Sequence, residues 1–204
     1  MEVLIVAKTF MKSAFCVGAY DLKTKMNIRL LTSSEENQPL DSKFEIGHIW
    51  DIDYLPRPNR IKPHVEDVLV QKARYVRVQT RLNEYLIKTV NIWEGGPEII
   101  FNGKIKFPNG QSGFLEQKFS EIKQSVGFWL PDKDLELTVL DDHKHYFYFG
   151  EEQVFAFPYV GSNKVIDKIT KGTLIRVSLA RWWSPNIDRQ QKRCYCQLSG
   201  WYEN

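Results

Sequence analysis

Six aromatic and cationic residues gather near the end of the chain: Arg181, Trp182, Trp183, Arg189, Lys192 and Arg193. Exposed aromatic rings stack on nucleobases for roughly 1–3 kcal/mol per base, and Lys and Arg side chains neutralise phosphates. This combination predicts a surface that contacts nucleic acid. The alternative is that the two Trp side chains close a barrel or cover a seam between domains.

A second basic stretch lies earlier, within the expected strand over residues 67–78. Arg74 and Arg77 flank Tyr75 there, and strand alternation places Arg77 and Tyr75 on one face and Arg74 on the other. The stretch therefore offers one or two phosphate contacts at most. A solvated face without any ligand is the alternative interpretation.

Motifs for catalysis or for cofactor binding are missing from the sequence. It contains no P-loop, no Gly-x-Gly-x-x-Gly fingerprint and no Gly-x-Ser-x-Gly elbow. Cys194 and Cys196 are separated by one residue, which differs from the two-residue spacer of zinc knuckles, and no second Cys pair exists. We therefore expect no cofactor, no metal site and no catalytic residue, and favour a binding protein over an enzyme.

Charge and composition narrow the class of protein further. Although the net charge is only +3, residues 56–81 hold seven Lys or Arg against two acids, whereas residues 131–153 hold two against seven. Any basic surface is therefore local. No apolar run approaches the roughly 20 residues that span a bilayer, so we expect no membrane partner. The odd count of three Cys favours a reducing, cytoplasmic compartment.

The elements that must position these residues are mostly strands. Five short β-prone segments precede residue 80 and suit a small barrel, whereas residues 80–93 show helical spacing with Thr80 as a plausible N-cap. Strand character returns from residue 126 and ends in a long hairpin, with short helices expected at Phe114–Gln124 and Asn163–Lys171. We predict a mainly β chain of two OB-like barrels, at 1–79 and 126–204, with a mixed helical linker at 80–125.

Short motifs at both ends of the chain resemble a known family. They are Leu4-Ile-Val-Ala-Lys-Thr9, Phe15-Cys-Val-Gly-Ala19, Asn27-Ile-Arg-Leu30, Pro63-His-Val-Glu-Asp-Val-Leu-Val70, Val177-Ser-Leu-Ala180 and Arg193-Cys-Tyr-Cys-Gln-Leu-Ser-Gly-Trp-Tyr202. In these segments the chain is similar to the prokaryotic dual OB-containing domain family. The resemblance implies two OB folds, nucleic-acid binding and a place in bacterial defence systems. The resemblance also points to four polar residues at positions of the family pattern, which could form either a ligand pocket or a structural bridge between strands. These residues are Lys8, Arg29, His64 and Glu66.

Three functions follow as hypotheses. The first is a non-catalytic module that binds single-stranded or structured RNA or DNA within a bacterial defence or repair system. The second is a protein-interaction subunit, because the acidic stretch at 131–153 suits a protein partner. The third is an enzyme or sensor with a nucleotide pocket built from the four residues of the family pattern.

Overall fold

The computed structural model describes residues 1–117, 122–140, 143–184 and 192–203. Its first part is a closed barrel of five strands, ordered β1-β2-β3-β6-β5, in which β5 pairs again with β1 and the β3–β6 pair is parallel. A two-residue strand, β4 (Gln38–Pro39), extends the sheet at β2. The five strands are β1 (Glu2–Met11), β2 (Ala14–Asp21), β3 (Asn27–Leu31), β5 (His48–Pro56) and β6 (Asp67–Val78).

Strand alternation explains how the barrel fills its interior. Val3, Ile5, Val17 and Leu30 pack inside it, together with Ile52. The run Val3–Ala7 is nevertheless buried on both faces of β1. Its outward face is covered by the second part of the chain, which is why this strand is a continuous apolar run.

The second part is a half-barrel built from two sheets, ordered β12-β11-β10-β13 and β7-β9-β14-β15-β8. Large aromatic side chains fill its core, among them Trp129, Tyr146 and Phe157. Two short helices, α1 (Leu82–Thr89) and η1 (Pro97–Gly103), precede most of it. Its strands are β7 (Ile92–Gly95), β8 (Phe114–Glu116), β9 (Val126–Pro131), β10 (Leu135–Leu140), β11 (His143–Phe149), β12 (Val154–Pro158), β13 (Lys168–Ile169), β14 (Leu174–Leu179) and β15 (Arg193–Tyr202).

The prediction of a mainly β chain with OB-like units and a few short helices is confirmed, but two expected helices are wrong. Within the span Phe114–Gln124, residues 118–121 lie outside the described part of the chain, and Phe114–Glu116 form β8, which pairs with the start of β15 and buries Leu115 against Cys194. In place of a helix at Asn163–Lys171, β13 pairs with β10 and buries Ile169. In both places a distant strand supplies a ladder that outweighs the local helical spacing.

The start of the helix α1 also differs from the expected cap. Helix α1 begins at Leu82, and Arg81, with a φ of 53°, occupies the N-cap position that we expected for Thr80. Arg81 makes no capping hydrogen bond with its side chain. None of the helices in the described part of the chain is long and apolar enough to cross a membrane.

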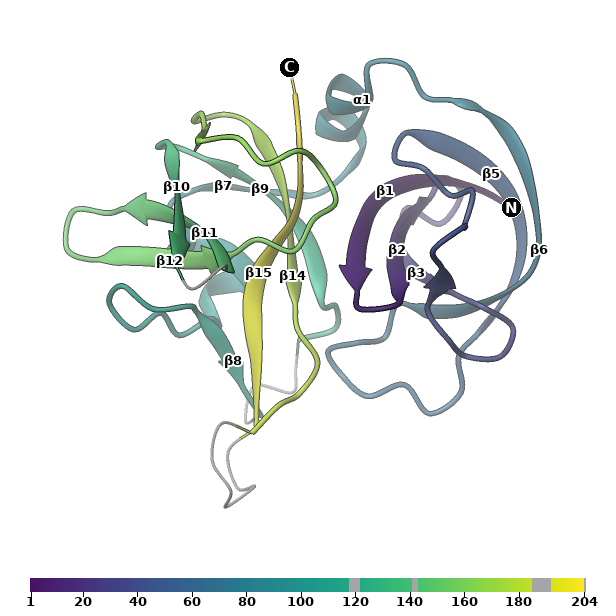
Figure 1. Cartoon of the computed structure of the whole chain (residues 1–204), viewed down its shortest axis with the longest axis horizontal. Coiled ribbons are helices and arrows are strands. Elements are labelled where there is room, and N and C mark those ends of the chain that lie inside the picture. Colours follow the sequence, from purple (N-terminus) through teal and green to yellow (C-terminus); the bar gives the residue numbers. More distant parts are fainter. Residues whose placement is uncertain (118–121, 141–142, 185–191, 204) are drawn as a thin grey trace.

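The barrel and the half-barrel lie side by side in Figure 1, with α1 near the top between them, and they share an apolar cluster. Leu4, Val6 and Ile49 contribute from the barrel, whereas Phe128 and Tyr202 contribute from the half-barrel. Val6 is skipped in the register of β1 with β2, and its carbonyl accepts a hydrogen bond of 2.6 Å from the Tyr202 hydroxyl. The two parts therefore pack directly against each other, through a shared apolar cluster and a hydrogen bond.

Candidate nucleic-acid interface and arginine-lined cavity

One end of the β14–β15 hairpin presents aromatic rings beside cations. Trp183 and Arg193 exchange backbone hydrogen bonds beyond β14, so both lie at this end, which extends downward in Figure 1. The Trp183 side chain is 57% exposed, and its ring centroid lies 6.1 Å from that of Tyr195. The Arg193 guanidinium lies 4.1 Å from the centroid of the Phe114 ring. With the exposed Lys192, these side chains form what we call the hairpin-end surface.

Trp182 has a different environment from Trp183. Its indole is half-buried against the core of the half-barrel, and its Nε1 donates a hydrogen bond of 2.8 Å to the carbonyl of Lys62. Trp182 therefore covers the seam between the two parts. Arg189 lies outside the described residues.

The other predicted cations are paired with carboxylates. Arg181 binds Asp67 at 2.7 Å. On the barrel, Arg74 binds Asp51 at 2.9 Å and Arg77 binds Glu2 at 3.2 Å. Strand β6, which carries Arg74 and Arg77, lies at the edge of the molecule opposite the half-barrel in Figure 1, so these two residues do not join the hairpin-end surface.

The four residues of the family pattern separate into two pairs. Lys8 is buried, binds Glu45 at 2.6 Å and lies over the Phe15 ring. His64 is also buried, and its Nε2 donates to the carbonyls of Leu179 and Ala180 at 3.2 and 3.1 Å. The polar atoms of Lys8 and His64 therefore contact groups of the protein itself.

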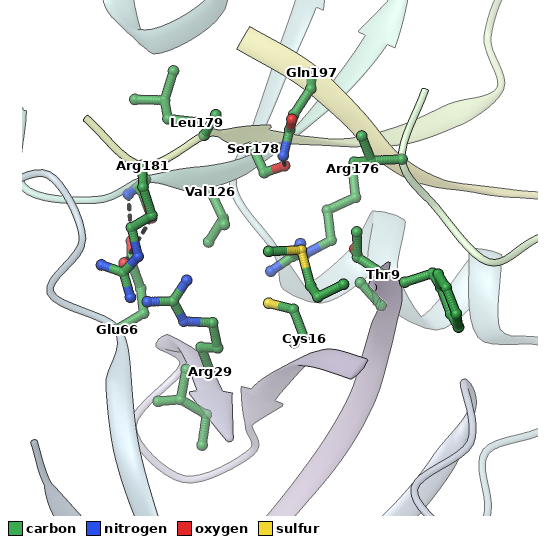
Figure 2. A pocket seen from close by; sticks show the side chains of 18 residues that line it. Thr9, Cys16, Arg29, Glu66, Val126, Arg176, Ser178, Leu179, Arg181 and Gln197 are labelled. Atoms are coloured by element: carbon green, nitrogen blue, oxygen red, sulfur yellow. Dashed lines mark hydrogen bonds between the residues drawn. The ribbon is translucent and has the colours of Figure 1, made fainter. Parts of the chain in front are cut away.

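Arg29 and Glu66 instead line a cavity of about 240 Å³ between the barrel and the half-barrel. Strands β1, β2 and β3 form one side of it, and β14 with the segment that follows it forms the other (Figure 2). Cys16 and Arg29 extend into the cavity from the barrel, and Arg176 and Ser178 line it from the half-barrel. The Arg181 guanidinium lies beside that of Arg29 in the same view.

Two carboxyl groups hold this region together. The Glu66 carboxylate accepts hydrogen bonds from the amide and the hydroxyl of Ser125, and burial raises the pKa of Glu66. The Asp67 side chain is 2% exposed and pairs with Arg29, with Arg57 at 3.2 Å and with Arg181 at 2.7 Å. Asp67 thereby fixes the guanidinium groups of two cavity-lining arginines.

Arg176 is the functional candidate that sequence reasoning missed. The residue is 5% exposed, and its Nη1 donates to the Ser199 hydroxyl at 3.0 Å. Within the described ranges its Nε has no acceptor, and no carboxylate lies within ion-pair distance of it. Burial lowers the pKa of this guanidinium. The feature that could have pointed to Arg176 is its place within an apolar strand, β14, in which the structure buries all six residues.

Gly18 provides the space that the Arg176 guanidinium occupies. A Cβ atom added to Gly18 would stand 2.6 Å from Nη2 and 3.0 Å from Cζ of Arg176. The guanidinium therefore packs directly on the backbone of β2. Across residues 1–117, 122–140, 143–184 and 192–203, no group of three or more His, Cys, Asp or Glu side chains could hold a metal ion.

A family of known proteins matches nearly the whole sequence. The sequence model described as "Dual OB-containing domain" matches residues 1–201. No curated protein matches the chain.

Several solved structures are similar to this chain at low sequence identity. The Ifi202 HINa domain in complex with 20-bp dsDNA is 10% identical, with a TM-score of 0.39 over 98% of this chain and 95% of that one. A murine DNA-binding protein bound with dsDNA is 12% identical, with a TM-score of 0.31 over 97% and 91% of the two chains. The tetrameric p202 HIN2 is 11% identical, with a TM-score of 0.29 over 99% and 89%.

Proposed function

This chain belongs to the dual OB-containing domain family, and we propose that it is a non-catalytic module that binds single-stranded or structured RNA or DNA. Its contact region is the hairpin-end surface. The observation that carries the proposal is Trp183, whose ring is more than half exposed beside Lys192, Arg193 and Tyr195. A large aromatic side chain left in water among cations suits base stacking with phosphate neutralisation.

The contacts within the hairpin-end surface suggest a separate role for each of its side chains. Trp183 offers a ring face for a base, and the Tyr195 ring lies beside it at a tilt of 50°. Lys192 and Arg193 lie where phosphates would pass, and Phe114 holds the Arg193 guanidinium in place. For a single strand, the logarithm of the binding constant falls by about 0.7 per neutralised phosphate for each unit of log salt concentration. Two phosphate contacts therefore give a modest but measurable salt dependence.

Family membership supports a role in a bacterial defence or repair system, and the cysteines support the cytoplasm as its compartment. Both remain proposals. A protein-interaction subunit remains the alternative function, and a nucleic-acid binding test separates the two.

Fluorescence anisotropy with labelled single-stranded RNA, single-stranded DNA and duplexes tests the proposal. Trp183→Ala should weaken binding about 5- to 150-fold, which corresponds to the loss of one stacked base at roughly 1–3 kcal/mol. Its melting temperature should stay unchanged, because the side chain is exposed.

Phe149→Ala is the matched control, because Phe149 is 50% exposed and lies on β11. It should bind as the wild-type protein does. If Trp183→Ala binds as tightly as Phe149→Ala, the stacking surface is wrong. If the wild-type protein binds none of the nucleic acids, the function itself is wrong, and a protein partner becomes the next hypothesis.

A further inference from the structure

We infer that the cavity between the barrel and the half-barrel is a binding site for a phosphate monoester, held by Arg29, Arg176 and Arg181. The site is distinct from the hairpin-end surface. It goes beyond the proposed function, because the cavity can be occupied whether or not a strand lies on that surface.

The unpaired charge of Arg176 is the first reason. A buried charge is normally paired or hydrogen-bonded throughout, since its transfer out of water is costly. The Arg176 guanidinium donates one hydrogen bond to the Ser199 hydroxyl, and its Nε has no acceptor. Among the described residues it has no carboxylate partner. The fork of a guanidinium matches two oxygens of a phosphate, which would provide the missing acceptors.

The charge balance around the cavity is the second reason. Arg29, Arg57, Arg176 and Arg181 supply four positive charges, and Glu35, Glu66 and Asp67 supply three negative charges, because Arg57 also binds Glu35 at 2.9 Å. The region therefore keeps a net positive charge that an anion can neutralise. A phosphate monoester carries about −1.5 to −2 at neutral pH.

The shape and lining of the cavity favour an ester over the inorganic ion. Its volume of about 240 Å³ is several times the roughly 30 Å³ that one water molecule occupies. Ala7, Ile28 and Val126 supply apolar wall, and Phe10 and Met11 extend the lining at the turn between β1 and β2. Phe10 is 58% exposed and Met11 is 46% exposed, so an organic group has apolar surface to cover.

Cys16 provides a reporter inside the cavity. It is half-buried and lines the wall, whereas Cys194 and Cys196 are fully buried and burial raises the pKa of both thiols, that of Cys194 to about 12. Iodoacetamide should therefore alkylate Cys16 first, and a ligand in the cavity should slow that reaction.

The experiment measures Cys16 alkylation by mass spectrometry, together with the melting temperature, for the full chain. The probes are inorganic phosphate, adenosine 5′-monophosphate, adenosine, and one oligonucleotide with either a 5′-phosphate or a 5′-hydroxyl. Inorganic phosphate, adenosine 5′-monophosphate and the 5′-phosphorylated strand should slow alkylation, whereas adenosine and the 5′-hydroxyl strand should not. Inorganic phosphate and adenosine 5′-monophosphate should also raise the melting temperature, and adenosine should not. Protection by adenosine 5′-monophosphate identifies a free nucleotide as a source, and protection by the 5′-phosphorylated strand alone identifies a strand end. If inorganic phosphate, the nucleotide and the phosphorylated strand all fail, the inference is overturned.

Two variants distinguish a binding role of Arg176 from a structural one. Arg176→Met should weaken probe binding about 10- to 150-fold, as expected for losing a charged hydrogen bond, and should raise the melting temperature of the ligand-free protein, because an uncompensated buried charge is removed. Gly18→Ala retains Arg176 but displaces its guanidinium, so it should weaken binding while the protein stays folded.

Arg74→Met is the control, because it removes an exposed guanidinium that does not line the cavity. It should leave probe binding unchanged. Unchanged probe binding in both Gly18→Ala and Arg176→Met would assign Arg176 a purely structural role. Trp183→Ala should retain binding of adenosine 5′-monophosphate, so this inference and the proposed function can fail separately.

Discussion

At the scale of the residue, the Asp67 carboxylate binds three guanidinium groups and links the two parts of the molecule through one of them, that of Arg181. Three guanidinium groups reach it from three places in the chain: β3, the loop after β5, and the segment after β14. The carboxylate is almost fully removed from water. Such a group is tolerated because charged partners replace its hydration.

Replacement of this carboxylate should be strongly destabilising. Asp67→Asn leaves Arg29, Arg57 and Arg181 without their common partner, so we expect the free energy of unfolding to fall by about 3–5 kcal/mol. Urea denaturation followed by tryptophan fluorescence measures the change. Asp51→Asn is the control, because Asp51 is exposed and pairs with Arg74 at the surface; an equal loss in both variants would contradict the role of Asp67.

The sequence allowed only part of the candidate site to be predicted at this scale. Trp183, Lys192 and Arg193 were found because they are close together in the sequence and need no distant partner to be recognised. Arg176 was missed, because its burial depends on contact with Gly18 in the other part of the chain. Arg74 shows the opposite case, since its neutralisation by Asp51 comes from a neighbouring strand and not from adjacent residues.

At the scale of the element, the loop between β5 and β6 and the segment after β14 hold each other. His64 of the loop donates to carbonyls at the end of β14, and Trp182 donates back to the carbonyl of Lys62. The loop between β5 and β6, which contains Pro58 and Pro63, therefore packs against the half-barrel. Its proline residues limit its conformations, so little entropy is lost on docking.

This connection should weaken in acid because of His64. Burial lowers the pKa of His64 below the ordinary value of about 6.5. As the pH falls through 6.5, the unfolded chain takes up a proton that the native protein does not, so stability that is present at neutral pH is progressively lost. Glu66 has the opposite effect on stability as the pH falls. Its pKa is raised in the native state, so the native protein takes up this proton before the unfolded chain does.

A comparison of wild type with His64→Gln isolates this contribution, because Glu66 is present in both. The free energy of unfolding, measured in urea at about pH 7.5 and pH 5.5, should fall less between the two conditions in the variant. Gln retains an N–H donor for the two carbonyls, which limits the loss at neutral pH. Identical pH dependence in the two proteins would show that His64 does not sense pH.

Most strands were predictable, whereas two short elements were not. Strands such as β10 and β14 could be predicted from the β-prone residues that they contain. Strands β8 and β13 are only three and two residues long, and each exists because β15 or β10 lies beside it. Local spacing contains no information about these partners, which explains the two wrong helices.

At the scale of the whole molecule, the apolar cluster shared by both parts makes them interdependent. Leu4, Val6 and Ile49 would lie on the outside of an isolated barrel and are covered here by Phe128 and Leu174. The expected boundaries near residues 79 and 126 remain a proposal about architecture. The shared cluster predicts that both sides of those boundaries unfold together.

Tyr202→Phe tests this interdependence. The substitution removes the hydroxyl that donates to the carbonyl of Val6 and leaves that carbonyl buried without this donor, so we expect a loss of about 1–3 kcal/mol in the free energy of unfolding. Unfolding should stay a single transition by fluorescence and by near-ultraviolet circular dichroism. Tyr75→Phe, at a half-exposed position on β6, should cause little change. Two separate transitions would show that the parts fold independently.

The packing of Arg176 on Gly18 also has a consequence for evolution. Any side chain at position 18 competes with the guanidinium for the same space, so the two positions can change only in concert. A lineage that acquires a larger residue at 18 must shorten the residue at 176, and one that loses the arginine no longer needs the glycine. Among related sequences, this pair should therefore covary, and its joint disappearance would identify the branches that abandoned the cavity.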